Sequence, residues 1–217
     1  MRFASVCTAL WVLTSSFGGS VAVASPAQSE VADLPMLLRL LAQMPGMQAQ
    51  FSEKKTMALL AAPLVTTGAL YYTQPGVLAR HTLTPAPSVV VVDAKQVRMW
   101  DGKRWEVLDF AKQPVVRGFV DSFVRILQGD AAALDKLYGM QFAALPEGRW
   151  TLTLRPKMAP MNQIIESMTL SGQRLVVVSM RMVEKGGDET VTTFSAVDTA
   201  RRFADAEKTK YFPQPGQ

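Results

Sequence analysis

Few residues of this 217-residue chain could carry out covalent chemistry. The chain holds one histidine, His81, and one cysteine, Cys7. A G-x-S-x-G segment is missing, so a serine hydrolase would have to use His81 as its only imidazole base. The same inventory leaves only carboxylates to bind a metal, and the spacing of a calcium-binding loop is missing too. The sequence therefore predicts a protein that is not an enzyme and that uses no metal or other cofactor.

Residues 1–24 have the three parts of a secretory signal peptide. Arg2 supplies the positive start, an apolar run too short to cross a bilayer follows, and the Ala-Val-Ala of residues 22–24 suits a signal peptidase. Cys7 lies inside this leader, so residues 25–217 would depend on a hydrophobic core and not on disulfides. We expect cleavage after residue 24, a periplasmic location and one domain over residues 25–217.

The charge of the chain gives little information about its function. The formal net charge is +5, and Lys and Arg occur as scattered pairs, never as a long block. A mildly basic solvated surface is the simplest interpretation, and a patch that contacts a membrane surface is the alternative. An exported protein of this kind is not expected to bind nucleic acid.

The spacing of apolar residues predicts a helix followed by many strands. Asp33 can cap an amphipathic helix whose leucines recur at helical spacing until Pro45 and Gly46 end it. From Met47 onward the period changes to two, and turn residues separate the apolar segments. The Asp-Gly at 101–102 predicts a hairpin between QVRMW and RWEVLDF.

Two more helices are expected in the middle of the chain. One has an apolar stripe from Phe119 to Leu127, and the other is capped by Asp130 and runs through Tyr138 to Gly139. The remainder gives about ten antiparallel strands, a number at which a sheet tends to curl, with the helices as plugs or lids. The predicted fold class is mainly β.

The stretch YYTQPGVLARHTL, residues 71–83, places Arg80 and His81 among aliphatic residues of a predicted strand. We expect His81 at the surface or at the edge of the sheet. Methionines on or between the strands either fill the core or form a soft, adaptable lining for ligands. They are Met99, Met158, Met161, Met168, Met180 and Met182.

The order of several motifs resembles the LolA family, the periplasmic carriers of outer-membrane lipoproteins. The matching segments are MQAQFSEK, GALYYTQPGVLARH, VVVVDAKQVRMW, WTLTLRPK and a closing aromatic-Pro-x-Pro-Gly. Each is weak alone, but their shared order over nearly the whole chain is fairly specific. The segments LQGDAAALDKLYG and GGDET look closer to a divergent branch of the family. The resemblance implies an unclosed β-barrel with a helical lid over a hydrophobic cavity.

The resemblance also implies the positions of a site. Gln74 stands where the family has an arginine that holds the lid shut, Leu78 stands at a cavity-mouth phenylalanine, and Arg80 replaces a cavity tryptophan. Arg80 then either faces an anionic headgroup or extends to water at the rim of the sheet. Alternate strand positions predict the ligand-binding residues, although the parity of the first strands could shift by one: Leu70, Tyr72, Leu78, Val90, Val92, Met99, Trp150, Leu152, Met180 and Met182.

Two functions fit this resemblance. A monomeric carrier would take the acyl chains of a lipoprotein or other lipid from an inner-membrane donor complex to an outer-membrane acceptor, touching membranes transiently. Alternatively, a non-transporting envelope module would sense lipids or mislocalised lipoproteins and regulate a partner, as LolA-like domains of sigma-factor regulators are thought to do. A hydrolase would need a nucleophile and base that the sequence does not offer.

Overall fold

A computed structural model describes residues 31–112, 125–126 and 128–216. Its strands are β1 (Gly46–Thr56), β2 (Leu64–Thr73), β3 (Val77–Thr84), β4 (Ser88–Val92), β5 (Gln96–Trp100), β6 (Trp105–Asp109), β7 (Tyr138–Leu145), β8 (Arg149–Pro156), β9 (Ile165–Gln173), β10 (Val176–Glu184) and β11 (Glu189–Asp198). Its helices are α1 (Leu34–Ala42), α3 (Ala131–Leu137), α4 (Met161–Ile164) and α5 (Asp205–Tyr211), with a 3₁₀ turn, η1 (Pro146–Gly148).

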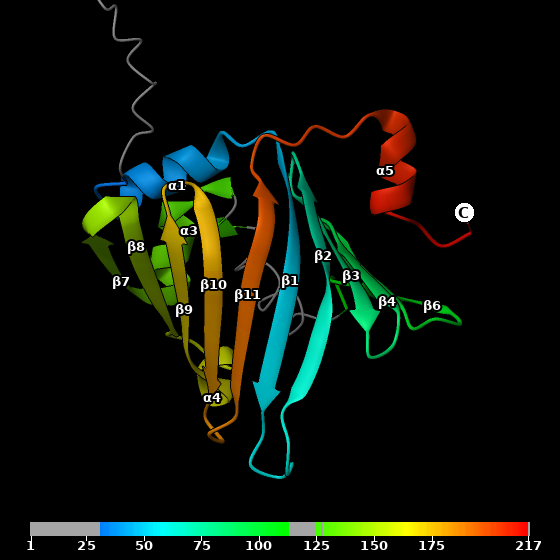
Figure 1. Ribbon diagram of the computed structural model, residues 1–217, viewed down its shortest axis with the longest axis horizontal. Helices are drawn as coiled ribbons and strands as arrows, with labels where there is room; N and C mark the ends of the chain where they lie inside the picture. The colour runs from blue at the N-terminus through cyan, green and yellow to red at the C-terminus, as the bar shows by residue number, and fades with distance from the viewer. Residues whose placement is uncertain (1–30, 113–124, 127, 217) are drawn as a thin grey trace, which may run out of the picture.

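All eleven strands join one antiparallel sheet in the order β6-β5-β4-β3-β2-β1-β11-β10-β9-β8-β7. The first and last strands, β1 and β11, therefore pair near its middle. Within the described residues β6 and β7 do not pair with each other, so the sheet curves without closing (Figure 1). The predicted mainly-β, unclosed antiparallel fold is confirmed, with one strand more than the roughly ten expected.

Local signals explain the elements that the sequence predicted. Asp33 caps α1, since its carboxylate accepts a hydrogen bond from the backbone N–H of Met36 at 2.8 Å. The predicted hairpin between β5 and β6 forms around Asp101, whose carboxylate accepts hydrogen bonds from the backbone N–H groups of Lys103 and Arg104 at 2.9 Å each. Both predictions are confirmed.

Other boundaries differ from expectation. The helix after Asp130 ends at Leu137, and Tyr138 already begins β7, a strand that the sequence analysis did not recognise. Pairing with β8 along its whole length stabilises this segment as a strand, although no Gly or Pro separates it from the helix. Helix α5 was also missed. The signal peptide predicted at 1–24 and the apolar stripe from Phe119 to Leu127 lie outside the described residues.

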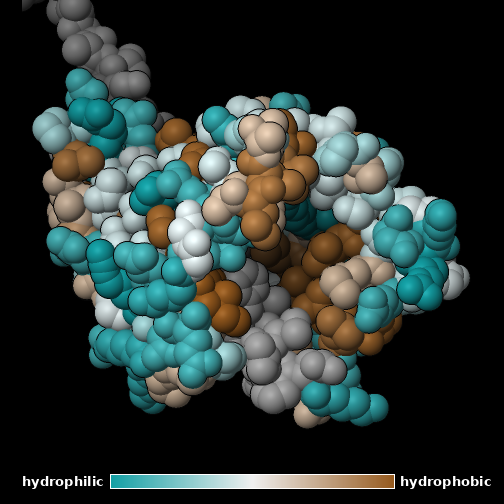
Figure 2. Space-filling model, turned by 90° about the horizontal axis from the view of Figure 1, so that it is seen from below, coloured by the Kyte–Doolittle hydropathy of each residue, from teal (hydrophilic) through white to brown (hydrophobic). Residues whose placement is uncertain are grey.

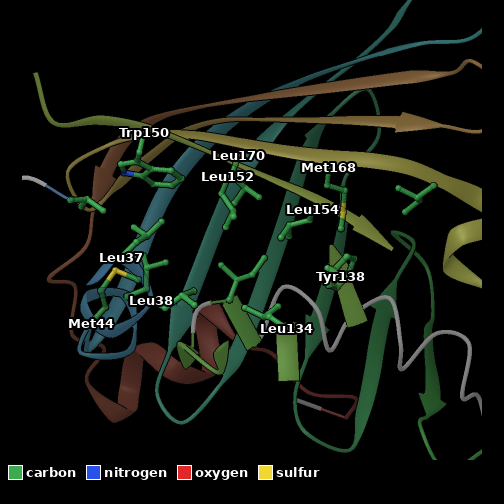
Figure 3. Packing of buried hydrophobic residues seen from close by; sticks show 14 residues of the cluster. Leu37, Leu38, Met44, Leu134, Tyr138, Trp150, Leu152, Leu154, Met168 and Leu170 are labelled. Atoms are coloured by element: carbon green, nitrogen blue, oxygen red, sulfur yellow. The ribbon is translucent and has the colours of Figure 1, made fainter. Parts of the chain in front are cut away.

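The concave side of the sheet is covered unequally. Seen from below, it is hollowed, and apolar residues lie on the walls of the hollow (Figure 2). Next to the hollow, α1 and α3 pack on strands β7–β9 and form the larger core (Figure 3). Its buried side chains include Leu37, Leu38, Leu41, Leu134, Tyr138, Trp150, Leu152, Leu154, Ile165 and Met168.

The convex side carries a smaller aromatic cluster beneath α5. Tyr71, Phe203 and Tyr211 contact one another there, with ring centroids 4.5 to 6.2 Å apart. His81 joins them: its ring centroid lies 5.1 Å from that of Tyr71, and its Nε2 donates to the carbonyl oxygen of Tyr211 at 2.9 Å. Burial lowers the pKa of His81, and the hydrogen bond opposes that shift. The expected surface or edge position of His81 is wrong, because an inner strand holds it, half-buried, under a helix.

Candidate ligand-binding cavity

The hollow of the concave side contains a cavity of about 460 Å³. This volume lies within the roughly 300–1,000 Å³ typical of small-molecule sites. Apolar side chains from β1, β2, β3, β4, β10 and β11 form most of its wall, with Leu41 of α1 and Ile126 on the helical side. Alternation along each strand produces this wall, because residues two apart share a face. The concave face can therefore receive an apolar ligand.

Seven of the predicted residues line this cavity: Leu70, Leu78, Arg80, Val90, Val92, Met180 and Met182. Tyr72 and Met99 do not reach its wall. Tyr72 is fully buried, and Met99 packs against Val92, Val97 and Phe110. Trp150 and Leu152 lie in the core under α1 and α3. The ligand-binding role of all these residues stays a prediction.

Sequence reasoning missed much of the central floor of the cavity. This part comprises Met47, Ala49, Glu53 and Lys55 of β1 and Thr190, Thr192, Phe194 and Val197 of β11. Alternation along each strand is visible in the sequence and could have grouped these residues by face. The pairing of β1 with β11 could not be read in this way, because the two strands lie at opposite ends of the chain.

Arg80 does not stand alone at the cavity. Its Nη1 and Nη2 donate to the two carboxylate oxygens of Glu53 at 3.0 and 2.9 Å, and its guanidinium lies 4.2 Å from the centre of the Phe51 ring. The Thr192 hydroxyl donates to Glu53 at 3.0 Å. Burial alone would raise the pKa of Glu53, but Arg80 and Thr192 outweigh it and hold that pKa below its ordinary value. The cavity thus contains a carboxylate and a guanidinium that neutralise each other.

A second ion pair lies at the same end of the cavity. The ammonium of Lys55 donates to Glu184 at 2.8 Å, and this hydrogen bond is the main reason that the pKa of Lys55 is raised. Thr190, directly opposite Lys55 on β11, is only 5% exposed. Its hydroxyl has no hydrogen-bond partner among the described residues. An unpaired buried hydroxyl in a ligand cavity is unusual, because burial without a partner is unfavourable.

Gln74 connects the sheet to the end of α1. Its side-chain Nε2 donates to the carbonyl oxygens of Ala42 and Met44 at 3.1 and 3.2 Å, which are free because they lie at the C-terminal end of the helix. In the same turn, the carbonyl of Pro75 accepts a hydrogen bond from the side chain of Gln128 at 2.9 Å. These contacts give Gln74 the geometry of a latch, and its role in opening a lid stays a prediction.

The methionines divide between the two interpretations. Met180 and Met182 line the cavity, whereas Met168 fills the core and Met161 packs against it. Met158 is 57% exposed. In the part of the chain that the structure covers, no group of three or more His, Cys, Asp or Glu side chains could hold a metal ion. None of the helices described there is both long and apolar enough to cross a membrane.

Several known proteins are similar to this chain in sequence or in structure. An outer-membrane lipoprotein carrier protein of Pseudomonas syringae pv. syringae (strain B728a) is 24% identical over 172 residues, which cover 79% of this chain and 80% of the relative. One of Pseudomonas putida (strain GB-1) is 25% identical over 183 residues, covering 84% and 85%. A LolA superfamily protein of Nitrosomonas europaea has a crystal structure that covers 79% of this chain and 94% of its own, with a TM-score of 0.45 and 10% identity.

The family model described as "Outer membrane lipoprotein carrier protein LolA-like" matches residues 24–212, which is most of the chain. The resemblance predicted from the motifs is therefore confirmed. This chain belongs to the LolA-like family of outer membrane lipoprotein carrier proteins.

Proposed function

We propose that this protein is a periplasmic carrier that binds the acyl chains of a lipoprotein or other lipid in its cavity. It moves this cargo from an inner-membrane donor complex toward an outer-membrane acceptor. The observation that carries the proposal is the largely apolar cavity beneath α1, on a sheet of the LolA-like family. The proposal involves no cofactor and no catalysed reaction, and the protein acts as a monomer. Residues 1–24 direct its export.

The energetics require a release mechanism. Each buried methylene contributes about 0.8 kcal/mol, so a chain of roughly 16 carbons would contribute on the order of 12 kcal/mol before ordering costs. Cargo held that tightly would leave too slowly unless α1 moved. The contacts of Gln74 suit this movement, because two hydrogen bonds of about 1 kcal/mol each can hold a helix and still break often.

Transient membrane contact is supported at the other end of the sheet. Large apolar side chains are exposed there, around the β1–β2 loop and α4, opposite α1 (Figure 1). Leu59 is the most exposed of them, at 92%. The others are Leu60, Leu64, Val65, Leu83, Met158 and Ile164. Exposed apolar patches of this kind mark contacts with membranes or partner proteins, and the hollow is visible from the same end (Figure 2).

The test is mass spectrometry of intact complexes and of organic extracts from the protein purified gently from the periplasm. Leu78→Glu places a carboxylate in the cavity wall and should abolish lipid binding without unfolding the protein. Leu145→Glu is the matched control, because Leu145 is exposed on β7, away from the cavity. Circular dichroism and the unfolding midpoint of both variants show whether the fold is kept.

Each result has a defined meaning. A triacylated lipoprotein on the wild-type protein supports the carrier in its usual form, and a non-protein lipid supports a specialised lipid shuttle. A wild-type cavity that is reproducibly empty contradicts the carrier and favours the regulatory module. An unchanged lipid yield from Leu78→Glu contradicts the assignment of this cavity as the binding site.

A further inference from the structure

The convex face of the sheet carries a second pocket, on the side away from the cavity. It has a volume of about 350 Å³ and lies between the sheet and the C-terminal part of α5. Unlike the cavity, it is lined mainly by polar side chains, which include Asp93, Gln96, Arg98, Lys208, Thr209 and Gln214. The function proposed above makes no use of this pocket.

Arg98 is the buried charge in the convex pocket. Alternation along β5 places it on the convex side, since Val97 and Met99 on either side of it pack with Val92 on the concave side. Arg98 is only 5% exposed. A guanidinium so deeply buried is normally paired and hydrogen-bonded, because the loss of water around an unpaired charge is strongly unfavourable.

Asp93 balances this charge only in part. It is the charge partner of Arg98 among the described residues, with its Oδ2 3.3 Å from Nη2 of the arginine. Its Oδ1 accepts hydrogen bonds from the backbone N–H groups of Lys95 and Gln96 at 2.8 and 3.1 Å, so the turn before β5 fixes the carboxylate. Arg98 has five N–H donors, and this single contact leaves most of them for another acceptor.

The two Nη atoms are the part of Arg98 that a ligand can reach. Its Nε is enclosed and has no hydrogen-bond partner among the described residues, so a ligand in the pocket would meet Nη1 and Nη2. These two nitrogens form one edge of a planar group, which suits the two oxygens of a carboxylate.

The charges that line the pocket favour a singly charged anion. Its lining contains two cations, Arg98 and Lys208, and one carboxylate, Asp93, which leaves one positive charge. Lys208 also contacts Asp205 at 2.8 Å, but these side chains are 51% and 96% exposed, and such surface pairs are weak. A carboxylate would neutralise the lining, whereas a phosphate monoester would bring nearly two negative charges close to Asp93.

We propose that the convex pocket binds the carboxylate group of a small acid or of an acidic side chain on a partner protein. The Nη atoms of Arg98 donate to its oxygens, and Lys208 lies at the rim. The sheet separates this site from the cavity, so the proposal is independent of the cargo. Because β5 supplies Arg98 and α5 supplies Lys208, a bound carboxylate links the helix to the sheet.

The test is an NMR titration of the isotope-labelled protein, followed at the backbone amides of Gln96 and Thr209. Acetate represents a free acid, and a blocked Ala-Glu-Ala peptide represents an acidic side chain. Acetamide and a blocked Ala-Gln-Ala peptide are their neutral counterparts, and all four are added at equal ionic strength. We expect saturable shifts with a carboxylate probe and none with its neutral counterpart. Binding of acetate supports a small acid as the ligand, and binding of the acidic peptide alone supports a partner protein.

Three variants make the result specific. Arg98→Met removes the buried charge and should weaken binding about tenfold or more, the effect of losing hydrogen bonds from a charged group. Lys208→Gln changes only the exposed rim, so it tests the site even if Arg98→Met does not fold, and it should weaken binding about two- to fivefold. Lys210→Gln makes the same change on the same helix outside the pocket and should leave binding unchanged.

Several results would overturn the proposal. They are the absence of saturable shifts with both carboxylate probes, equal shifts from the neutral probes, and inorganic phosphate that binds more tightly than either carboxylate. Binding that is unchanged in a folded Arg98→Met protein, or in Lys208→Gln where Arg98→Met does not fold, would also overturn it.

Discussion

The two halves of the concave face have similar alternating strand patterns, but one half is a packed core and the other borders a cavity. On β8 and β9, large side chains such as Trp150, Leu152 and Met168 are buried in the core that these strands form with α1 and α3 (Figure 3). On β2 and β3, Leu70 and Leu78 stand at similar alternating positions but border the cavity. The strand pattern is the same in both halves. Among the described residues, the difference is that α1 and α3 pack closely on β7–β9, whereas a cavity remains over β2 and β3.

Trp150 is closely packed in the half that α1 and α3 cover. A Cβ added at Gly172 would lie only 2.2 Å from the ring of Trp150, so this glycine gives the indole the space it needs. The indole N–H donates to the carbonyl oxygen of Arg174 at 2.8 Å, which satisfies its polar group inside the core. The indole is therefore both closely packed and hydrogen-bonded, whereas the buried hydroxyl of Thr190 in the other half has no hydrogen-bond partner among the described residues.

The largest expected effect separates the two halves directly. Leu152→Ala should reduce the free energy of unfolding by about 2–5 kcal/mol, because it opens a void in a filled core. Leu78→Ala should cost about 1 kcal/mol or less, because Leu78 already borders empty space. Urea unfolding of the two variants without ligand measures the difference. Equal losses would mean that the cavity is as tightly packed as the core and would break the comparison.

An intermediate effect is expected from the ion pair in the cavity wall. Glu53→Gln should reduce stability by about 1.5–3 kcal/mol at neutral pH, because it removes the charge that Arg80 and Thr192 bind. The pKa of Glu53 is lowered by folding, so its contribution is full above its ordinary pKa of 4.5 and is lost as the pH falls below it. The gap between wild type and variant should therefore shrink in acid.

Urea midpoints at neutral pH and below pH 4.5 provide the measurement. Glu106→Gln on the exposed edge strand β6 is the control, and it should change little at either pH. A gap that grew on acidification would contradict the description of the ion pair.

The smallest effect concerns the contact that joins the halves. Gln74→Ala removes two hydrogen bonds, one to Ala42 at the end of α1 and one to Met44 just beyond it, and should reduce stability by about 1 kcal/mol. Hydrogen exchange should accelerate in α1 and not in α3, since both side-chain hydrogen bonds of Gln74 go to carbonyl oxygens at the C-terminal end of α1. Unchanged hydrogen exchange in α1 would show that the hydrogen bonds of Gln74 do not stabilise the helix. The core contacts of Leu37 and Leu38 would then be sufficient to position it.

Local signals in the sequence were sufficient to predict α1 and the hairpin at Asp101, because a cap and a turn depend on a few adjacent residues. They did not reveal α5, or that β7 begins at Tyr138, because strand pairing and helix docking supply the stability there. Alternation predicted the face of Leu70 and Leu78 correctly. It assigned Trp150 and Leu152 to the cavity wall as well, although they lie in the core. The residues of a strand do not indicate which part of the sheet a helix will cover.

The alternation pattern of one strand could not predict the polar contacts around Glu53 in the cavity wall. Glu53 and Thr192 lie at the two ends of the sequence, and only the pairing of β1 with β11 brings them together. Arg80 was visible in the sequence as an anomaly, but its carboxylate partner lies on β1, a strand that is not its neighbour in the sheet. Charge pairing across the curvature of a sheet depends on tertiary structure.

Within the described part of the chain, β6 and β7 do not pair, and this opening in the sheet has a mechanical consequence. A closed ring of strands can widen only by breaking ladder hydrogen bonds, whereas this sheet can flatten and leave every described strand pair intact. Flattening moves the two halves apart about β1 and β11, and the contacts that resist it are side-chain contacts such as those of Gln74 with α1. The described strand pairs therefore leave the width of the cavity adjustable.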